Sequence, residues 1–298
     1  MGSIKVGFIG LGNMGICMAK SLARAGFSLT VYDLRQEPID EMTALGAAAA
    51  NSPREVAEVS DVVISMVWDT TETEQVIFGK DGLWNGIKRG ATIIITSSIG
   101  PEYCRNLYAR VKERGVSVID CCVTGRDPQN GNRPVTLMIG GDEDRVKQCW
   151  PVFEGLGKNI FYLGEIGAGQ AYKLVNNMTG RHIGTAIQEY LIEGLNFGLK
   201  AGLDLQKMIE VMNAGPYSRN IQSLGLKPGM DSQKLIEIIR VPGTKPPGSA
   251  AHSTDELDDA REMAKAVGAK MPLCRFIDEL DAAATYDAYF ALMKQYKL

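Results

Sequence analysis

The chain has 298 residues, of which 45% are hydrophobic and 22% charged, a composition typical of a globular protein with length for two domains. Its formal net charge of −3 gives no general attraction to nucleic acid or to an acidic membrane surface, so we expect neither as a partner. No run of about 18 apolar residues occurs, and the N-terminus enters a predicted strand at once, which favours a cytoplasmic protein without a membrane span or signal peptide.

The first predicted strand, Lys5–Ile9, leads directly into a glycine turn that opens a helix. The turn reads Gly10-Leu11-Gly12-Asn13-Met14-Gly15 and matches the pattern G-x-G-x-x-G. In that pattern Gly10 permits a tight turn, Gly12 lets the backbone approach a pyrophosphate, and Gly15 lets the helix pack closely on the strand. The N–H groups at the helix N-terminus then bind the phosphates. We therefore expect all six residues to bind a dinucleotide.

A second predicted strand, Leu29–Tyr32, ends at Asp33, 18 residues after Gly15. A carboxylate at this place can bind the 2′-OH of an adenosine ribose and repels a 2′-phosphate, which favours NAD over NADP. Arg35 is a counter-indication, because its side chain could turn onto a phosphate. A glycine turn in another kind of α/β protein is the alternative, and the flanking strands and helix favour the dinucleotide site.

Strands and helices then alternate as far as residue 163, which predicts a Rossmann-type doubly wound parallel sheet. Ser52, followed by Pro53 and Glu55, is a typical helix N-cap sequence. The other predicted helices are Pro38–Leu45, Val76–Ile87, Pro101–Gly115 and Asp144–Leu156. The remaining predicted strands are Asp61–Val67, Ala91–Thr96, Ser117–Asp120, Val135–Ile139 and Asn159–Leu163.

Ligands of such sheets bind beyond the carboxyl ends of the strands. In this chain those ends carry the glycine turn, Asp33 and three further segments, which are Met66–Asp69, Thr96–Ser98 and Cys121–Arg126. The six cysteines have no C-x-x-C spacing and are expected to be reduced thiols. Because His182 and His252 are far apart, we expect no histidine-rich metal site.

After Gly167 the strand pattern stops, so we expect an NAD-binding domain over 1–165 and a helical substrate and dimerisation domain over 166–298. A long helical pattern covers Ala168–Lys200. Pro and Gly residues make Lys227–Ser249 mostly irregular. The other predicted helices are Leu205–Ala214, Thr254–Val267 and Leu273–Gln295.

Near the start of the long helix, Lys173 and Asn177 are four residues apart and face the same way. Gly180 and Gly184 fall within roughly 20° of Lys173 at about 100° per residue. A face that combines Lys, Asn and Gly fits a groove for a ligand better than an apolar core contact. A solvated helix lysine is the alternative for Lys173 considered alone.

With these motifs in place, the sequence resembles the β-hydroxyacid dehydrogenase family over nearly its whole length. Residues 7–15 are similar to the family's opening, and Gly167-x-Gly169-Gln170-x-x-Lys173-x-x-Asn176-Asn177 is similar to its catalytic motif. The resemblance implies that Lys173 is the catalytic acid and base, that the assembly is a homodimer or homotetramer, and that NAD is the cofactor. From these motifs and the strand ends together we expect cofactor contacts from Met66, Val67 and Ser98 and substrate contacts from Ser97, Thr124, Gly125, Arg126 and Asn177.

The sequence departs from the family pattern mainly in its substrate loop, where Arg126, Gln129 and Arg133 stand in place of glycines. A late lysine of the family is replaced by Asp255. We therefore expect a small anionic substrate that Arg126 grips, unless the arginine turns outward to solvent or to a partner subunit. An imine or sulfonate substrate would also fit these departures. A dinucleotide-binding sensor without turnover is an alternative of a different class, and the presence of Lys173 and Asn177 argues against it.

Overall fold

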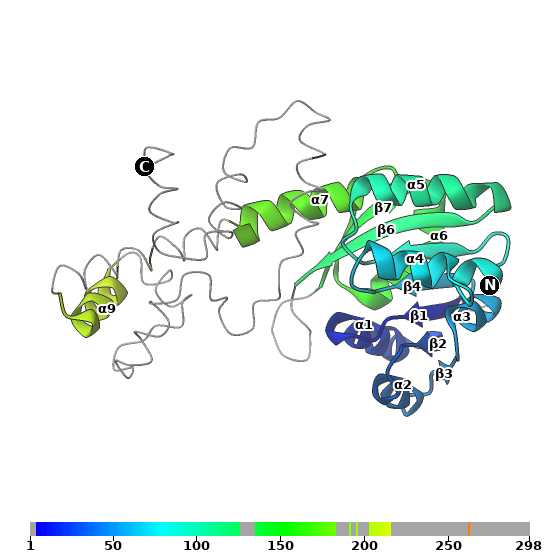
Figure 1. Ribbon diagram of the computed structural model, residues 1–298, viewed down its shortest axis with the longest axis horizontal. Coiled ribbons are helices and arrows are strands. Elements are labelled where there is room, and N and C mark those ends of the chain that lie inside the picture. Colours follow the sequence, from blue (N-terminus) through cyan, green and yellow to red (C-terminus); the bar gives the residue numbers. More distant parts are fainter. Residues whose placement is uncertain are drawn as a thin grey trace. The chain divides into compact units, whose positions relative to one another are not determined.

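The computed structural model describes residues 4–125, 135–182, 191, 195, 203–215 and 262. The chain divides into two compact units, Met1–Val175 and Asn176–Leu298. The first unit is built on one eight-stranded sheet with the order β3-β2-β1-β4-β5-β6-β7-β8 (Figure 1). The strands are β1 Lys5–Ile9, β2 Ser28–Tyr32, β3 Ala48–Ala49, β4 Val62–Ser65, β5 Thr92–Ile95, β6 Ser117–Thr124, β7 Thr136–Gly141 and β8 Asn159–Tyr162.

The predicted Rossmann-type sheet is confirmed, with one reversal of strand direction. All neighbouring strands are parallel except β6 and β7, which pair antiparallel with Asp120 opposite Gly140 and Thr124 opposite Thr136. Eleven residues separate the end of β6 from the start of β7, and a parallel crossover needs a dozen or more. The expectation of parallel strands was therefore wrong at this one pair. The pairing also extends β6 to Thr124, beyond its predicted end at Asp120.

Helices cover both faces of this sheet. They are α1 Asn13–Arg24, α2 Gln36–Thr43, α3 Pro53–Val59, α4 Thr70–Phe78, α5 Pro101–Val111 and α6 Glu143–Leu156. Helices α1, α2 and α6 pack into one hydrophobic core, which contains Leu22 and Phe153. Helices α3, α4 and α5 pack into the other, which contains Leu107. Because the adjacent strand residues Val63 and Ile64 belong to different cores, the two cores lie on opposite faces.

Burial on both faces explains why β4 and β5 read as continuous apolar runs. Each large side chain so buried stabilises the fold by about 1.5–3 kcal/mol. The connections change face between β1 and β4, since α1 lies on one face and α3 on the other. That change marks the switch point at which doubly wound sheets bind ligands.

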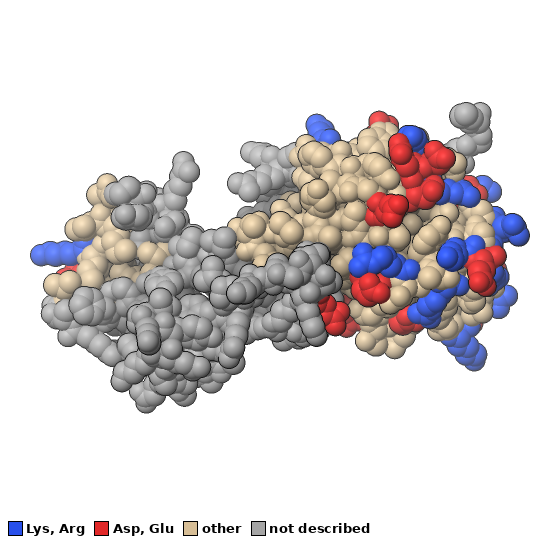
Figure 2. Space-filling view, turned by 90° about the horizontal axis from the view of Figure 1, so that it is seen from above, with Lys and Arg blue, Asp and Glu red and all other residues tan. Residues whose placement is uncertain are grey.

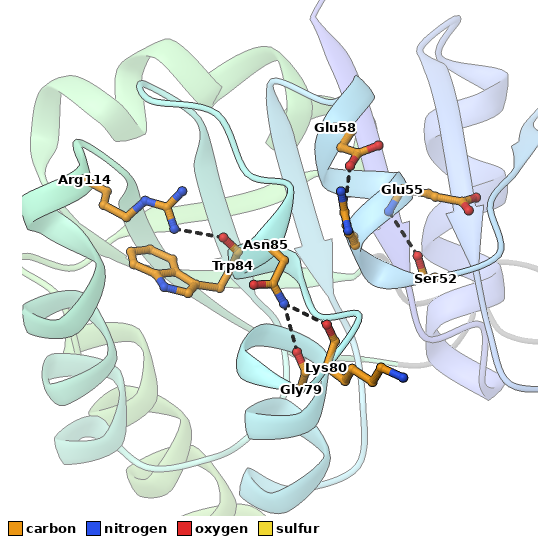
Figure 3. Close-up of polar contacts among 9 residues, drawn as sticks. Ser52, Glu55, Glu58, Gly79, Lys80, Trp84, Asn85 and Arg114 are labelled. Carbon is orange, nitrogen blue, oxygen red and sulfur yellow. Dashed lines mark hydrogen bonds and ion pairs between the residues drawn. The ribbon is translucent and has the colours of Figure 1, made fainter.

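The helix expected over Val76–Ile87 is instead α4, which ends at Phe78, and a separate 3₁₀ turn, η1 Leu83–Asn85. Gly79 caps α4, and a Cβ there would lie 2.3 Å from the Gln75 carbonyl oxygen. Asn85 Nδ2 then donates to the carbonyls of Gly79 and Lys80, which stabilises the turn (Figure 3). Glycines at 79 and 82 thus break a periodicity that otherwise continues.

The predicted N-cap of α3 is confirmed. Ser52 Oγ accepts a hydrogen bond from the Glu55 amide at 3.2 Å, and Pro53 occupies the first turn (Figure 3). The Glu55 carboxylate reaches back to the Asn51 amide at 2.8 Å. Helix α5 is followed by the 3₁₀ turn η2 Lys112–Arg114, so the helix predicted to Gly115 is shorter than expected.

Helix α7, Ala168–Asn177, begins in the first unit and is followed by a π-helical turn, Met178–His182. In the second unit, α9 spans Leu205–Ala214 as predicted, and Asp204 caps it by accepting from the Lys207 amide. The predicted helices over 254–267 and 273–295, and the irregular segment over 227–249, lie outside the described residues except for the helical residue Glu262.

Charges of both signs alternate over the described face of the first unit that Figure 2 shows, without a patch of one sign. Within the described part of the chain, no helix has the length and apolar character needed to cross a membrane. Three or more metal-ligating side chains do not gather anywhere among the described residues.

Candidate active site

The glycine turn after β1 is shaped by the protein at two positions and left open at the third. Gly10 has φ +90°, and a Cβ there would lie 2.2 Å from the Met66 carbonyl oxygen, at the end of β4. A Cβ on Gly15 would lie 1.9 Å from the carbonyl oxygen of Gly10. No atom lies within 4 Å of a Cβ built on Gly12. Because nothing in the described protein fills that space, the backbone at Gly12 is accessible to a ligand group.

The N-terminus of α1 adds an electrostatic component to this open space. Gly12 is the N-cap and provides no side chain to the first N–H groups, and the first turn contains no acidic residue. Arg24 lies in the last turn. The positive end of the helix dipole at Asn13 and Met14 is therefore available to an anion, as in a pyrophosphate site. The residues present fit the dinucleotide that the sequence predicts.

Asp33, just beyond β2, is fixed beside the glycine turn. Its carboxylate accepts hydrogen bonds from the Leu11 amide at 2.6 Å and from the Arg35 amide at 2.9 Å. The Arg35 side chain donates to the same carboxylate at 3.1 Å and to the Leu11 carbonyl at 3.2 Å. Partial burial acts to raise the pKa of Asp33, but these hydrogen bonds outweigh it and hold the pKa below its usual value. Asp33 is therefore ionised at neutral pH.

The loops after β4 and β5 are joined through Ser97. Its buried hydroxyl donates to the Val67 carbonyl at 2.7 Å and accepts from the Val67 amide at 3.0 Å. Thr96 Oγ1 contacts the Met66 sulfur at 3.0 Å. Between the buried residues Ser97 and Ile99, Ser98 is partly exposed. The residues expected to contact cofactor or substrate here therefore lie in two linked loops, and within the loop after β5 it is Ser98 that reaches the surface.

Lys173 is bound to the carboxyl end of β6. Its ammonium donates to the Val123 carbonyl oxygen at 2.8 Å, and its side chain is half-buried. Val123 immediately precedes Thr124 and Gly125, two of the residues expected to bind substrate. The structure thus brings Lys173 next to residues that are expected to bind substrate, and Lys173 is not a fully solvated lysine.

Two of the expected substrate residues cannot be placed in this way. Arg126 lies outside the described residues. Asn177 is buried and belongs to the second unit, four positions after Lys173 on α7. Its side-chain oxygen lies 3.5 Å from Asn176 Nδ2.

Two buried residues that the sequence prediction did not include among the site residues connect α7 to the sheet. Asp120, in the middle of β6, accepts from the amides of Gly167 at 2.6 Å and Gln170 at 2.8 Å. Burial raises the pKa of Asp120 to about 6, despite these hydrogen bonds. A Cβ on Gly140 or on Gly169 would lie 2.6 or 2.8 Å from a carboxylate oxygen of Asp120. An acidic residue inside the apolar run of β6 was the available sequence signal.

Gln170 is the second of these residues, and its side-chain amide bonds only to backbone. Nε2 donates to the Ser97 carbonyl at 2.8 Å, and Oε1 accepts from the amides of Ile99 at 3.1 Å and Gly100 at 3.2 Å. The backbone also favours glycine at two positions of the Gly167-x-Gly169-Gln170 motif. Gly167 has φ +92°, and a Cβ on Gly169 would lie 2.3 Å from the Met138 carbonyl.

Comparison with known proteins places this arrangement. Residues 5–164 match the family model of the NAD-binding domain of 6-phosphogluconate dehydrogenase. Residues 167–289 match the model for NAD-binding of NADP-dependent 3-hydroxyisobutyrate dehydrogenase. The chain is 37% identical to NAD-dependent L-serine dehydrogenase of Pseudomonas aeruginosa, over 70% of this chain and 68% of that protein. It is also 37% identical to 2-hydroxy-3-oxopropionate reductase of Escherichia coli, over 73% of each.

Solved structures give the same placement. Mycobacterium tuberculosis 3-hydroxyisobutyrate dehydrogenase with L-serine matches with a TM-score of 0.67 and 25% identity over the whole of both chains. An imine reductase of Myxococcus stipitatus in complex with NADP⁺ shares the fold, with a TM-score of 0.60 at 18% identity over 98% of this chain and 94% of that one.

The Rossmann-type sheet and its open glycine turn, together with the matching family models and relatives, identify an oxidoreductase with an NAD(P)-binding domain. Within that class, the chain belongs to the β-hydroxyacid dehydrogenase family, as both family models and the relatives show.

Proposed function

We propose that this protein interconverts a small hydroxy acid and its carbonyl form with NAD, and that Lys173 is the general acid and base. The observation that carries the proposal is the Lys173 ammonium, 2.8 Å from the Val123 carbonyl at the carboxyl end of β6. The glycine turn follows the carboxyl end of β1, which is parallel to β4, β5 and β6. A reactive lysine and a dinucleotide turn at one edge of a sheet suit hydride-transfer chemistry.

The cofactor would be held by residues of the linked loops and the glycine turn. Bound nicotinamide supplies a hydride acceptor or donor. Asp33 would accept a hydrogen bond from the ribose 2′-OH, and the N-terminus of α1 would bind the pyrophosphate. The proposed cofactor contacts are Gly10, Leu11, Gly12, Asn13, Met14, Gly15, Asp33, Met66, Val67 and Ser98.

In this proposal Lys173 carries the proton at Nζ. A neutral amine has two N–H groups and one lone pair, and the Val123 carbonyl accepts one of those N–H groups. The lone pair is then available to accept the hydroxyl proton as hydride leaves the substrate carbon. In the reverse direction the ammonium donates a proton to the carbonyl oxygen as the carbon receives hydride. The Val123 carbonyl orients Nζ in both directions of the reaction, which lowers the entropic cost of reaching a reactive geometry.

The substrate would lie against the loops after β5 and β6. Hydroxyls and amides there are suited to a carboxylate, and an arginine would add a bidentate donor. We propose that the contacts come from Ser97, Thr124, Gly125, Arg126 and Asn177. The Ser97 hydroxyl is already hydrogen-bonded to the Val67 backbone. Ser97 would therefore contact the substrate through its backbone, or would act indirectly by positioning Ser98. The names of the relatives, L-serine dehydrogenase and 2-hydroxy-3-oxopropionate reductase, support small hydroxy acids or their carbonyl forms as substrates.

NAD is proposed over NADP because Asp33 is ionised and would repel a 2′-phosphate. Arg35 supports this choice, since its guanidinium is hydrogen-bonded to Asp33 and to the Leu11 carbonyl instead of being turned toward a 2′-phosphate. We further propose an NAD-binding domain over 1–165, a helical substrate and dimerisation domain over 166–298, a homodimer or homotetramer, and a cytoplasmic location. These follow from the sequence pattern and the family.

The test is turnover with three hydroxy acids or carbonyl forms, namely L-serine, 3-hydroxyisobutyrate and 2-hydroxy-3-oxopropionate, each with NAD(H) and NADP(H). We expect NAD-linked turnover with at least one of them. A cyclic imine is included because an imine reductase shares the fold. Turnover of the imine alone would replace the proposed substrate class. Dinucleotide binding without turnover of any compound would favour a sensor.

A further inference from the structure

The side chain of Gln170 has an unusual use for a buried amide on a helix. It is only 1% exposed, and both its donor and its acceptor bond to the backbone of the loop after β5. Leaving such a group unsatisfied in the interior is energetically costly. The three hydrogen bonds therefore attach Gln170 to the loop.

These hydrogen bonds enclose Ser98. The Ser97 carbonyl precedes Ser98, and the amides of Ile99 and Gly100 follow it. Gly100 has φ +81°, a turn geometry that L side chains rarely adopt. Gln170 thus fixes the backbone on both sides of Ser98, the partly exposed residue of this loop. We call residues 97–100 the Ser98 turn.

The same helix carries Lys173, three residues after Gln170. The start of helix α7 is bound to β6, because the Gly167 and Gln170 amides donate to Asp120. Lys173 is bound to Val123 on the same strand. Between these two attachments to β6, Gln170 provides an attachment to the neighbouring β5 loop. A single rigid helical turn therefore links the Ser98 turn to Lys173.

We propose that Gln170 is a positioning residue that holds the Ser98 turn and Lys173 in one alignment for hydride and proton transfer. This inference rests on the proposed function, since it assumes that Ser98 contacts the cofactor and that Lys173 moves the proton. It assigns to Gln170 no contact with substrate. A misplacement of about 1 Å between reacting groups can lower turnover by about 10²-fold. Loss of the alignment should therefore lower kcat by about 10–100-fold and change the KM of the acid less.

The main variant is Gln170→Met, which keeps the length of the side chain and removes its hydrogen bonds. Tyr172→Phe is the matched control, because Tyr172 lies on the same helix and is 54% exposed. Steady-state kinetics would use whichever of L-serine or 3-hydroxyisobutyrate the enzyme oxidises. Hydrogen exchange at the amides of residues 97–100 and titration with NADH would be measured on the same samples, without turnover.

We expect Gln170→Met to lose the stated kcat, to speed exchange at the Ile99 and Gly100 amides, and to bind NADH within about threefold of the parent. Tyr172→Phe should match the parent in all three measurements. An unchanged kcat in Gln170→Met would overturn the positioning role. Unchanged exchange at the two amides would overturn the link itself.

A second variant, Gln170→Glu, decides the matter if Gln170→Met does not fold. When protonated, the introduced carboxyl can donate to the Ser97 carbonyl and accept from the two amides, and when ionised it cannot donate. Burial raises the pKa of such a group. The ratio of variant to parent kcat should therefore rise as pH falls. A flat ratio far below one would overturn the proposal.

Lys173→Ala, measured alongside, separates this inference from the proposed function. If Lys173→Ala loses turnover and Gln170→Met does not, only the positioning role fails. If Lys173→Ala keeps turnover, the proton-transfer role of Lys173 in the proposed function fails and the positioning role fails with it, while the exchange result still reports on the hydrogen bonds.

Discussion

Asp120 offers a quantitative prediction, because two physical effects oppose each other at its carboxylate. Desolvation favours the neutral form, whereas the amides of Gly167 and Gln170 at the start of α7 favour the charged form. Burial is the larger effect, and the pKa of Asp120 rises from 3.8 to about 6. The perturbation is Asp120→Asn, which keeps the shape of the side chain and removes its ionisation.

The magnitude follows from linkage. Between pH 3.8 and about 6 the folded state binds the proton of Asp120 and the unfolded state does not. The contribution of this group to the free energy of unfolding is therefore fully present below pH 3.8 and is lost as pH rises through 6. A shift of about two units corresponds to about 3 kcal/mol. Other carboxylates change the stability of the parent protein over this range, so only the difference between parent and variant isolates Asp120.

The assay is urea unfolding of parent and Asp120→Asn at several pH values from about 3.5 to about 7.5, a range that brackets the pKa of Asp120 in both states. We expect the parent's free energy of unfolding, relative to the variant's, to fall by about 2–3 kcal/mol from the lowest to the highest pH. The hydrogen bond that Asn cannot accept from one amide adds a constant offset. A flat difference would refute the burial argument. A difference that grows with pH would show that the two amides outweigh desolvation.

Four further predictions concern the site and the core. Lys173→Ala should lower kcat by about 10²–10⁴-fold with NADH affinity retained, and a variant with most of its turnover would contradict the proton-transfer role. Gly12→Ala should weaken NADH binding in a titration while the melting temperature stays close to the parent's, whereas Gly15→Ala should lose about 1–3 kcal/mol in urea unfolding because its Cβ meets the Gly10 carbonyl; equal effects on stability would refute the distinction. Ser65→Ala should raise the free energy of unfolding by about 1 kcal/mol, since the buried Ser65 hydroxyl lacks a partner among the described residues, and a loss of stability would reveal a hydrogen bond there. Asp33→Ala should lower the ratio of kcat/KM with NAD to that with NADP, and an unchanged ratio would remove Asp33 from cofactor choice.

The sequence predicted the elements whose causes are local. Apolar runs of strand length located β4 and β5, and Ser52 with Pro53 located the start of α3. The antiparallel β6–β7 pair was missed, because strand direction depends on the length of a connection that carries no periodic signal of its own. The helix after β4 was overextended, since apolar periodicity continues through Gly79 and Gly82 while the backbone does not.

The sequence predicts candidate site residues where a motif marks them, and it does not mark residues whose partners are distant in the chain. Gly10, Gly12 and Gly15 can be recognised from the sequence, because their spacing forms the G-x-G-x-x-G motif. Gln170 and Asp120 do not, since their partners lie 47 to 73 positions away and are backbone groups. A backbone carbonyl such as that of Val123 has no residue type to recognise. The placement of Lys173 therefore could not be derived without the fold.

The antiparallel pairing of β6 with β7 also bears on how such an enzyme can change its substrate. Thr124 and Thr136 are direct partners, so the chain leaves the sheet and re-enters it at adjacent positions. The attachments of Asp120 and Lys173 lie on β6 itself and do not depend on the residues between these two threonines. A change of sequence between the two threonines would therefore leave both of these hydrogen-bonded anchors of α7 intact, including the one that holds the proposed proton-transfer lysine.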